Sequence, residues 1–264
     1  MQYNAEYKTC HQTSLSILKE FGFGNRLMES RIQTEVEKFI GRAKGQNGRP
    51  FDPNLMILSS VMNVIHSILF GTRLECGGPK INQIIDVIHR FNVSLLTELF
   101  AFPQLRYIPY YGRKWNNSLA LFNELSDFVG AALDDAMSGE KRESFARRYS
   151  EINSGRSKLI AVLCDLLSAG TDTTTTTLKW CLILLANHPD VQTRLQKEID
   201  SAVPRGERLP SLDDRPRLPF VEAALLEVMR FKTLIPLALP HRTLCETKVE
   251  EYSIPDNVVV RASF

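Results

Sequence analysis

Residues 158–187 read KLIAVLCDLLSAGTDTTTTTLKWCLILLAN, and this run predicts a long apolar helix that ends at His188-Pro189. The centre of the run departs from the apolar pattern, because Ala169-Gly170-Thr171-Asp172-Thr173-Thr174 occupies it. Glycine and β-branched residues each lower helix propensity by about 0.5 kcal/mol or more. A helix that keeps them in its centre therefore has another reason for them, either in packing or in chemistry.

The small and hydroxyl-bearing residues of this segment are open to two interpretations. Ala169 and Gly170 let a flat ligand approach the backbone closely, and the Thr173 hydroxyl can donate a hydrogen bond to the carbonyl oxygen of Ala169, one helical turn earlier. Asp172 adds an ionisable group beside the hydroxyls, which is the composition of a proton relay. The alternative is a buried helix with small residues where another helix crosses. Taken alone, the segment favours that alternative.

Helical periodicity also dominates the rest of the chain, so the sequence predicts a mainly α protein. Helices are expected over 15–40 with a break at 21–24, over 53–72 from the start signal Asp52-Pro53, and over 81–91 with an irregular continuation. Further helices are expected over 115–137, 190–202 and 220–231. Residues 103–112, 138–157 and 203–219 are interpreted as connections. Strand patterns occur only at 242–249 and 253–262, which predicts a small β element near the C-terminal end.

Composition excludes several classes of protein. The 264 residues include 32 Lys and Arg against 30 Asp and Glu, a net charge of +2 with no concentrated basic face, so no nucleic-acid partner is expected. The five cysteines and five histidines are scattered, which argues against a disulfide scaffold and against a metal site within the chain. The uncharged stretch 53–72 contains too many polar residues for a membrane span and is interpreted as a buried or amphipathic helix.

A second local pattern is Glu227-Val228-Met229-Arg230. An acid and a base three residues apart on a helix lie on one face and can pair. On a solvated surface such a pair contributes about 0.5 kcal/mol or less and requires no function. Alone it is a weak signal.

The order of the motifs is far more specific than any one of them, and it resembles the cytochrome P450 family, most closely its animal microsomal drug- and steroid-metabolising branch. The succession is AGTDTT at 169–174, HP at 188–189, LPF at 218–220, EVMR at 227–230, PLALPHR at 236–242 and YSIP at 252–255. FGFGNR at 21–26, FDP at 51–53 and ILFGTR at 68–73 fit as well. The resemblance covers nearly the whole chain, so residues 1–264 are expected to form a single, incomplete domain of that fold.

The resemblance implies a haem monooxygenase that inserts one oxygen atom of O2 into a lipophilic organic substrate. Its cofactor would be haem (iron protoporphyrin IX), and its electrons would come from an NADPH-dependent reductase at the cytosolic face of the endoplasmic reticulum membrane. Thr173 would hydrogen-bond the bound dioxygen, and Asp172 would help to deliver protons. Ala169 and Gly170 would form the groove beside the oxygen.

Other positions receive roles by the same resemblance. Glu227 and Arg230 match a structural pair, and His241 matches a position that contacts a haem propionate. The residues expected to line the substrate pocket are Leu163, Leu166, Leu167, Leu234, Ile235, Leu237 and Leu239. The family's early helix carries Trp-Arg-x-x-Arg, which holds the propionates. Tyr7-Lys8-Thr9-Cys10-His11 stands there in this chain, so that Lys8 keeps a charge while Tyr7 and His11 replace the other two groups.

One departure from the family pattern bears on activity. The haem-binding loop Phe-x-x-Gly-x-Arg-x-Cys does not occur around any of the five cysteines. An axial thiolate favours O–O cleavage, so the chain by itself is expected to be inactive. The membrane anchor of this branch would likewise lie in an N-terminal segment that these residues do not include. The alternative is a truncated, non-catalytic product that acts at most as a binding or interaction protein.

Overall fold

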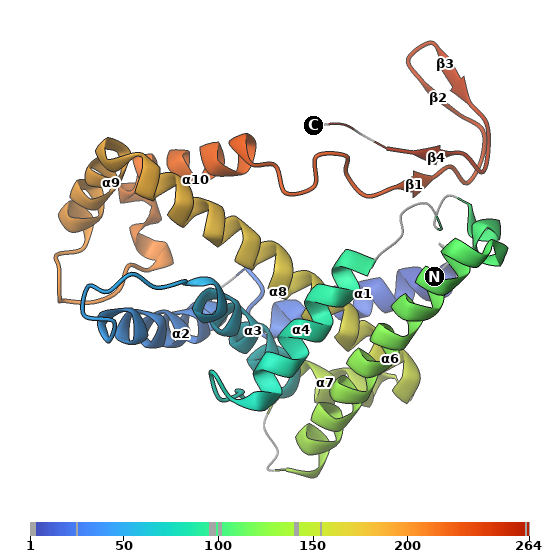
Figure 1. Ribbon diagram of the computed structural model, residues 1–264, viewed down its shortest axis with the longest axis horizontal. Helices are drawn as coiled ribbons and strands as arrows, with labels where there is room; N and C mark the ends of the chain where they lie inside the picture. The colour runs from blue at the N-terminus through green and yellow to red at the C-terminus, as the bar shows by residue number, and fades with distance from the viewer. Residues whose placement is uncertain are drawn as a thin grey trace.

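The computed structural model describes residues 4–24, 26–94, 99, 102–139, 143–153, 155–261 and 263. It is mainly α, as predicted (Figure 1). The α-helices are α1 (Ala5–Glu20), α2 (Arg26–Lys44), α3 (Asn54–Phe70), α4 (Pro79–Ser94), α6 (Pro109–Ser138), α7 (Phe145–Ile152), α8 (Arg156–Asn187), α9 (Pro189–Ala202) and α10 (Pro219–Phe231). Two 3₁₀ helices, η1 (Pro103–Tyr107) and η2 (Leu212–Arg217), lie between them.

Helix α8 is the central element of the fold and runs diagonally through the molecule (Figure 1). It contacts α3, α4, α6, α7, α9 and α10. Its buried side carries Leu159, Leu163 and Leu167, at the four-residue spacing that places side chains on one helical face. These leucines share a core with Met62 of α3 and Leu125 of α6. Burial of this face, rather than helix propensity, therefore holds α8 in place.

Helix α3 confirms the interpretation of residues 53–72 as a buried helix. Ten of its 17 residues are buried, including Asn63 and His66. It begins one residue later than predicted, and the Asp52 carboxylate accepts a hydrogen bond from the Asn54 backbone N–H at 2.9 Å. It ends at Gly71, whose φ of 74° is the left-handed conformation that glycine adopts without strain. None of the described helices combines the length and the apolar character needed to cross a membrane.

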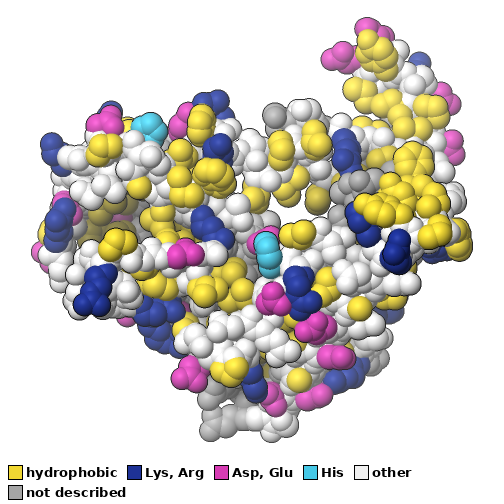
Figure 2. Space-filling model, in the orientation of Figure 1, with side chains coloured by type: hydrophobic (Ala, Val, Ile, Leu, Met, Phe, Trp, Pro, Cys, Tyr) yellow, Lys and Arg dark blue, Asp and Glu magenta, His cyan; other side chains and the backbone are white. Residues whose placement is uncertain are grey.

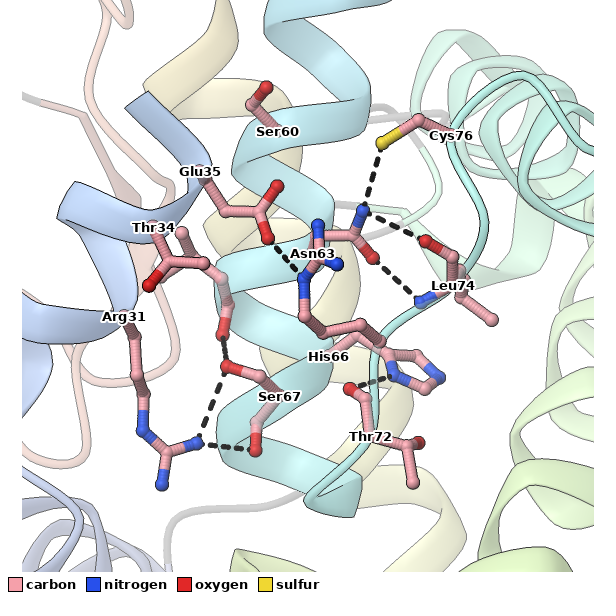
Figure 3. A network of polar contacts seen from close by, with 12 residues as sticks. Arg31, Thr34, Glu35, Ser60, Asn63, His66, Ser67, Thr72, Leu74 and Cys76 are labelled. Atoms are coloured by element: carbon pink, nitrogen blue, oxygen red, sulfur yellow. Dashed lines mark hydrogen bonds and ion pairs between the residues drawn. The ribbon is translucent and has the colours of Figure 1, made fainter. Parts of the chain in front are cut away.

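Polar contacts fasten the segment after α3 to α2 and α3 (Figure 3). Glu35 of α2 is buried and forms an ion pair with Arg73. Arg31 Nη1 donates to the Ser67 carbonyl oxygen at 2.6 Å. The same carbonyl oxygen also accepts from the Gly71 N–H at 3.1 Å, so Arg31 adds a second hydrogen bond at the C-terminal end of α3.

The amide of Asn63 and the ring of His66 complete this attachment. Asn63 Oδ1 accepts from the Leu74 N–H at 2.8 Å, while Asn63 Nδ2 donates to the Leu74 carbonyl oxygen at 3.1 Å. His66 Nδ1 lies 2.9 Å from the Thr72 carbonyl oxygen, which makes Nδ1 the protonated nitrogen. His66 Nε2 is buried and has no partner among the described residues. Desolvation lowers the pKa of His66 below 6.5.

Three of the predicted connections contain helix. Residues 109–112 were expected in a loop but form the first turn of α6, because Pro109 occupies the first helical position, where its missing N–H costs nothing. Helix α7 lies inside the connection predicted at 138–157. It is capped by Ser144 Oγ, which accepts from the Arg147 N–H at 3.3 Å, and it is anchored by the buried side chains of Phe145 and Tyr149. Helices η1 and η2 occupy parts of 103–112 and 203–219.

The β element forms two antiparallel pairs that stand apart from the helical body (Figure 1). Strand β1 (His241–Arg242) pairs with β4 (Val259–Val260), and β2 (Thr247–Val249) pairs with β3 (Tyr252–Ile254). The predicted strands are therefore confirmed in type and position but are shorter than expected.

Candidate functional site

The residues singled out at the centre of α8 lie on a face that the protein leaves open. Asp165 and Ala169 are exposed, and Asp172 and Thr173 are half-buried. Their spacing of three and four residues places them on one side of the helix, opposite Leu163 and Leu167. We call these four residues (Asp165, Ala169, Asp172, Thr173) the open face of α8.

The Thr173 hydroxyl makes the bond that the sequence predicted. Thr173 Oγ1 donates to the Ala169 carbonyl oxygen at 2.7 Å, and Thr177 Oγ1 donates to the Thr173 carbonyl oxygen at 3.1 Å. Thr171 makes the same bond to Leu167 at 2.6 Å. Since each hydroxyl satisfies its hydrogen within the helix, its oxygen keeps acceptor capacity. At Thr173 that capacity lies on the open face.

Asp172 is tied to α4 by a residue that the sequence did not indicate. Asn92 Nδ2 donates to Asp172 Oδ2 at 3.2 Å, and Ser168 Oγ donates to Asn92 Oδ1 at 3.0 Å. No local pattern could have found this contact, because it joins residues of different helices that are 80 positions apart.

Gly170 and Ala169 serve different purposes, although they are adjacent. A Cβ added to Gly170 would lie 3.1 Å from Ile65 Cδ1 of α3, so the glycine permits close approach of α3 and α8. This is the packing alternative considered for the segment, and it holds for Gly170. Ala169, in contrast, presents a small methyl group on the open face. The expectation that both residues border a ligand groove stays a prediction.

Two of the expected pocket residues are enclosed by the protein. Leu163 and Leu167 are 0% exposed in the helical core, so neither reaches the open face. Their assignment as pocket residues stays a prediction, and both lie on the side of α8 that packs in the core. Leu166 is half-buried, and the expected pocket residues after α10 are exposed, namely Leu234, Ile235, Leu237 and Leu239. Asp165 was missed, although its spacing of four residues before Ala169 places it on the same face.

The remaining site residues lie on α1, α10 and β1. Tyr7 and His11 stack on α1 with ring centroids 6.0 Å apart, and Lys8 is exposed beside them. His241 is exposed in β1. Glu227 and Arg230 form a bidentate pair on α10, in which Arg230 Nε and Nη2 each donate to a Glu227 oxygen at 2.7 Å.

The Glu227–Arg230 pair is exposed to solvent. The side chains are 59% and 70% exposed, respectively. The mutual hydrogen bonds lower the pKa of Glu227 and raise that of Arg230. Because water screens a pair this exposed, its contribution to stability is small.

Apolar surface is exposed on α8 and α10, and such surface would suit a broad, apolar group such as haem. Exposed apolar side chains come from α8 and α10, namely Leu178, Leu182, Ile183, Leu225, Leu226, Met229 and Phe231. Figure 2 shows apolar side chains along the rim of the hollow between the α9–α10 end and the β element. Extended apolar surface of this kind usually marks a binding site. A cavity of about 600 Å³ between α4 and α6 draws none of its lining residues from α8 and lies outside this site.

The described residues do not supply a set of protein ligands for a metal. No group of three or more His, Cys, Asp or Glu side chains gathers among them. Cys164 and Cys181 are buried, and burial raises the pKa of the Cys164 thiol to about 11, which keeps it neutral at physiological pH. Cys10 Sγ lies 3.3 Å from the Tyr149 hydroxyl in the helical body, and Cys245 is exposed between β1 and β2.

Comparison with known proteins gives consistent similarities. A family model described as Cytochrome P450 matches residues 2–264. Cytochrome P450 2B19 of Mus musculus is 30% identical over 273 residues, which cover 96% of this chain and 54% of that protein. Vitamin D(3) 25-hydroxylase of Sus scrofa is 33% identical over 271 residues, and Cytochrome P450 2D14 of Bos taurus is 33% identical over 273 residues, with the same coverage. The chain spans about half the length of the curated relatives it matches.

Proposed function

Because the chain belongs to the cytochrome P450 family, we propose that it serves in haem-dependent monooxygenation of a lipophilic organic substrate, with insertion of one oxygen atom of O2. The observation that carries the proposal is the open face of α8. It brings a small residue, a hydroxyl and a carboxylate together within about one helical turn, beside exposed apolar surface. The haem, when bound, would supply the redox chemistry, and the residues below would prepare the site around it.

The protein's own groups would position the reactants and move protons. The methyl side chain of Ala169 leaves room for a flat ring near the helix backbone. The Thr173 hydroxyl, held by the Ala169 carbonyl oxygen, offers its oxygen as an acceptor on the same face. Asp172 Oδ2 is held by Asn92, whereas Oδ1 accepts no hydrogen bond from the described residues. Asp172 would thus help to deliver protons on this side of α8.

The outer residues would complete binding. Tyr7, Lys8, His11 and His241 carry donor groups suited to haem propionates, with Lys8 as the formal positive charge. Leu166, Leu234, Ile235, Leu237 and Leu239 would favour a lipophilic substrate. The Glu227–Arg230 pair would act structurally. An NADPH-dependent reductase at the endoplasmic reticulum membrane would supply the electrons, as the resemblance to microsomal members suggests.

The test uses the protein as its gene encodes it, with haem, an NADPH-dependent reductase and a panel of lipophilic substrates under ¹⁸O₂. We expect a product that carries one ¹⁸O atom, with NADPH consumed. Ala169→Trp should abolish haem binding, seen as loss of the Soret absorption, because its ring fills the open face. The matched variant Ala131→Trp, at an exposed position of α6, should bind haem normally. Normal haem binding by Ala169→Trp, or the absence of ¹⁸O from every product, would refute the proposal.

A further inference from the structure

We propose that Asn92 is a positioning residue for Asp172, and that it links the end of α4 to the reactive face of α8. This inference rests on the proposed function. It starts from the two hydrogen bonds of the Asn92 amide, one to Asp172 and one from Ser168. It assigns to α4 a part in proton movement that neither the motif on α8 nor the resemblance provides.

The chemistry of the three side chains fixes the direction of both bonds. An ionised carboxylate only accepts, so the Asn92 NH2 group must face Asp172 and its oxygen must face Ser168. The Ser168 hydroxyl can donate to that oxygen, at 3.0 Å. Ser168 is 7% exposed, so water does not readily replace this bond. A flipped amide would place its oxygen against the carboxylate and its NH2 against the serine, and would lose the attractive contact with Asp172.

The position of Asn92 makes the amide a bridge between helices. Ser168 and Asp172 are four residues apart on α8, so the amide spans one turn of that helix. Asn92 lies in the last turn of α4. The neighbouring Phe91 packs against Phe122 of α6, with ring centroids 5.9 Å apart. Ser118 Oγ of α6 donates to the Ser94 carbonyl oxygen at 3.0 Å. A shift of this end of α4 would therefore release the carboxylate.

A neutral partner suits a carboxylate that must both take up and release protons. Asp172 makes no ion pair with any described residue, whereas a lysine or arginine partner would hold it firmly in the ionised form. Within seven residues, the ionisable neighbours of Asp172 on α8 are Asp165 and Lys179, and those of Asn92 on α4 are Asp86, His89 and Arg90. Arg90 is engaged by Asp86 at 2.7 Å and by Glu124 at 3.5 Å. The amide thus orients Asp172 without adding a charge.

The first experiment tests the contact in the 264-residue chain without haem. In Asn92→Asp, two carboxylates face each other, so one of them holds its proton to a higher pH in the folded state than in the unfolded state. Stability gained from that proton is present at low pH and lost as the pH rises. Relative to Asn92→Leu, we expect the Tm of Asn92→Asp to fall by about 2–4 °C between pH 4 and pH 8. Asn82→Asp, on the exposed first turn of α4, should show no such fall.

The second experiment measures product formed per NADPH consumed in the holoenzyme. Asn92→Leu should lower this ratio severalfold and raise peroxide release, with KM unchanged. Asn92→Asp should recover the ratio at acid pH, where the introduced carboxyl is protonated and can donate to Asp172. A merely structural asparagine would change Tm and leave the ratio and its pH profile as in the wild type.

The outcomes separate the two proposals. A pH-independent Tm difference between Asn92→Asp and Asn92→Leu would overturn the contact, whether or not the enzyme is active. An unchanged product ratio in Asn92→Leu would overturn the positioning role. If the wild type forms no product while the Tm values behave as expected, the monooxygenase function is overturned, and with it the role of Asn92 in catalysis. The bridge between α4 and α8 would then stand as a structural contact.

Discussion

Replacement of Gly170 by alanine tests whether packing against α3 requires this glycine. A Cβ at this position would lie 3.1 Å from Ile65 Cδ1 and 3.3 Å from Ile65 Cγ1. Carbon atoms pack best at about 3.5–4.0 Å, so the Ile65 side chain must move by a few tenths of an ångström. The substitution therefore combines a gain in helix propensity with a cost in packing.

The two contributions are similar in size. Alanine in place of a helical glycine gains about 1 kcal/mol, whereas a side chain forced away from its rotamer costs about 0.5–1.5 kcal/mol. Gly170→Ala should therefore change the free energy of unfolding by less than about 0.5 kcal/mol. Gly41 of α2 is the matched control, since a Cβ there meets nothing within 4 Å. Gly41→Ala should stabilise the chain by about 1 kcal/mol.

Urea unfolding followed by far-UV circular dichroism measures both variants. A third variant, Ile65→Val, removes the Cδ1 atom that causes the closest contact. In the Ile65→Val background, Gly170→Ala should gain about 1 kcal/mol, as at Gly41. If Gly170→Ala is as stabilising as Gly41→Ala with Ile65 intact, the glycine is not needed for packing and the account of this contact is wrong.

Three further predictions follow from burial and hydrogen bonding. Because desolvation lowers the pKa of His66, the unfolded chain takes up a proton at a higher pH than the folded chain does. The free energy of unfolding should therefore fall as the pH drops below 6.5. His66→Phe should weaken this dependence of stability on pH, as measured by thermal melts at several pH values. Leu163→Ala should lower the free energy of unfolding in urea by about 3 kcal/mol, and Leu166→Ala should lower it clearly less. Equal losses would contradict the assigned faces of α8. Thr173→Val keeps the branched shape of the side chain and removes the hydroxyl, so the Tm should change little. The holoenzyme should release more peroxide per NADPH consumed. An unchanged ratio of peroxide to NADPH would leave Thr173 a packing residue.

The sequence predicted most helices because their signals are local. The periodicity of 158–187 and the start signal Asp52-Pro53 act within a few positions, and the structure confirms both helices. Helix α7 was missed because its core residues, Phe145, Ala146 and Tyr149, stand in a charged background over only eight residues. Pro109 was placed in a connection, although proline is well suited to begin a helix.

The site was predictable only where its contacts lie within one helix. The bond from Thr173 to Ala169 follows from a four-residue spacing, and it was expected. The bond from Asn92 to Asp172 depends on where α4 packs against α8, which no local pattern encodes. Assignment of Leu163 and Leu167 to the pocket stays a prediction, although both side chains lie in the helical core. The resemblance gave a stretch of sequence, whereas the helical period decides which of its side chains face the pocket.

The run of small residues in α8 is continuous because neighbouring positions on a helix point in different directions. Each residue is rotated by about 100° from the one before it, so Ala169, Gly170 and Thr171 face three different environments. Ala169 faces the open side, Gly170 meets Ile65 of α3, and Thr171 is buried with its hydroxyl bonded to Leu167. Close approach of α3 and a reactive surface on α8 are therefore not competing explanations of the segment. Tight packing on one side fixes the helix that carries Thr173 and Asp172 on the other.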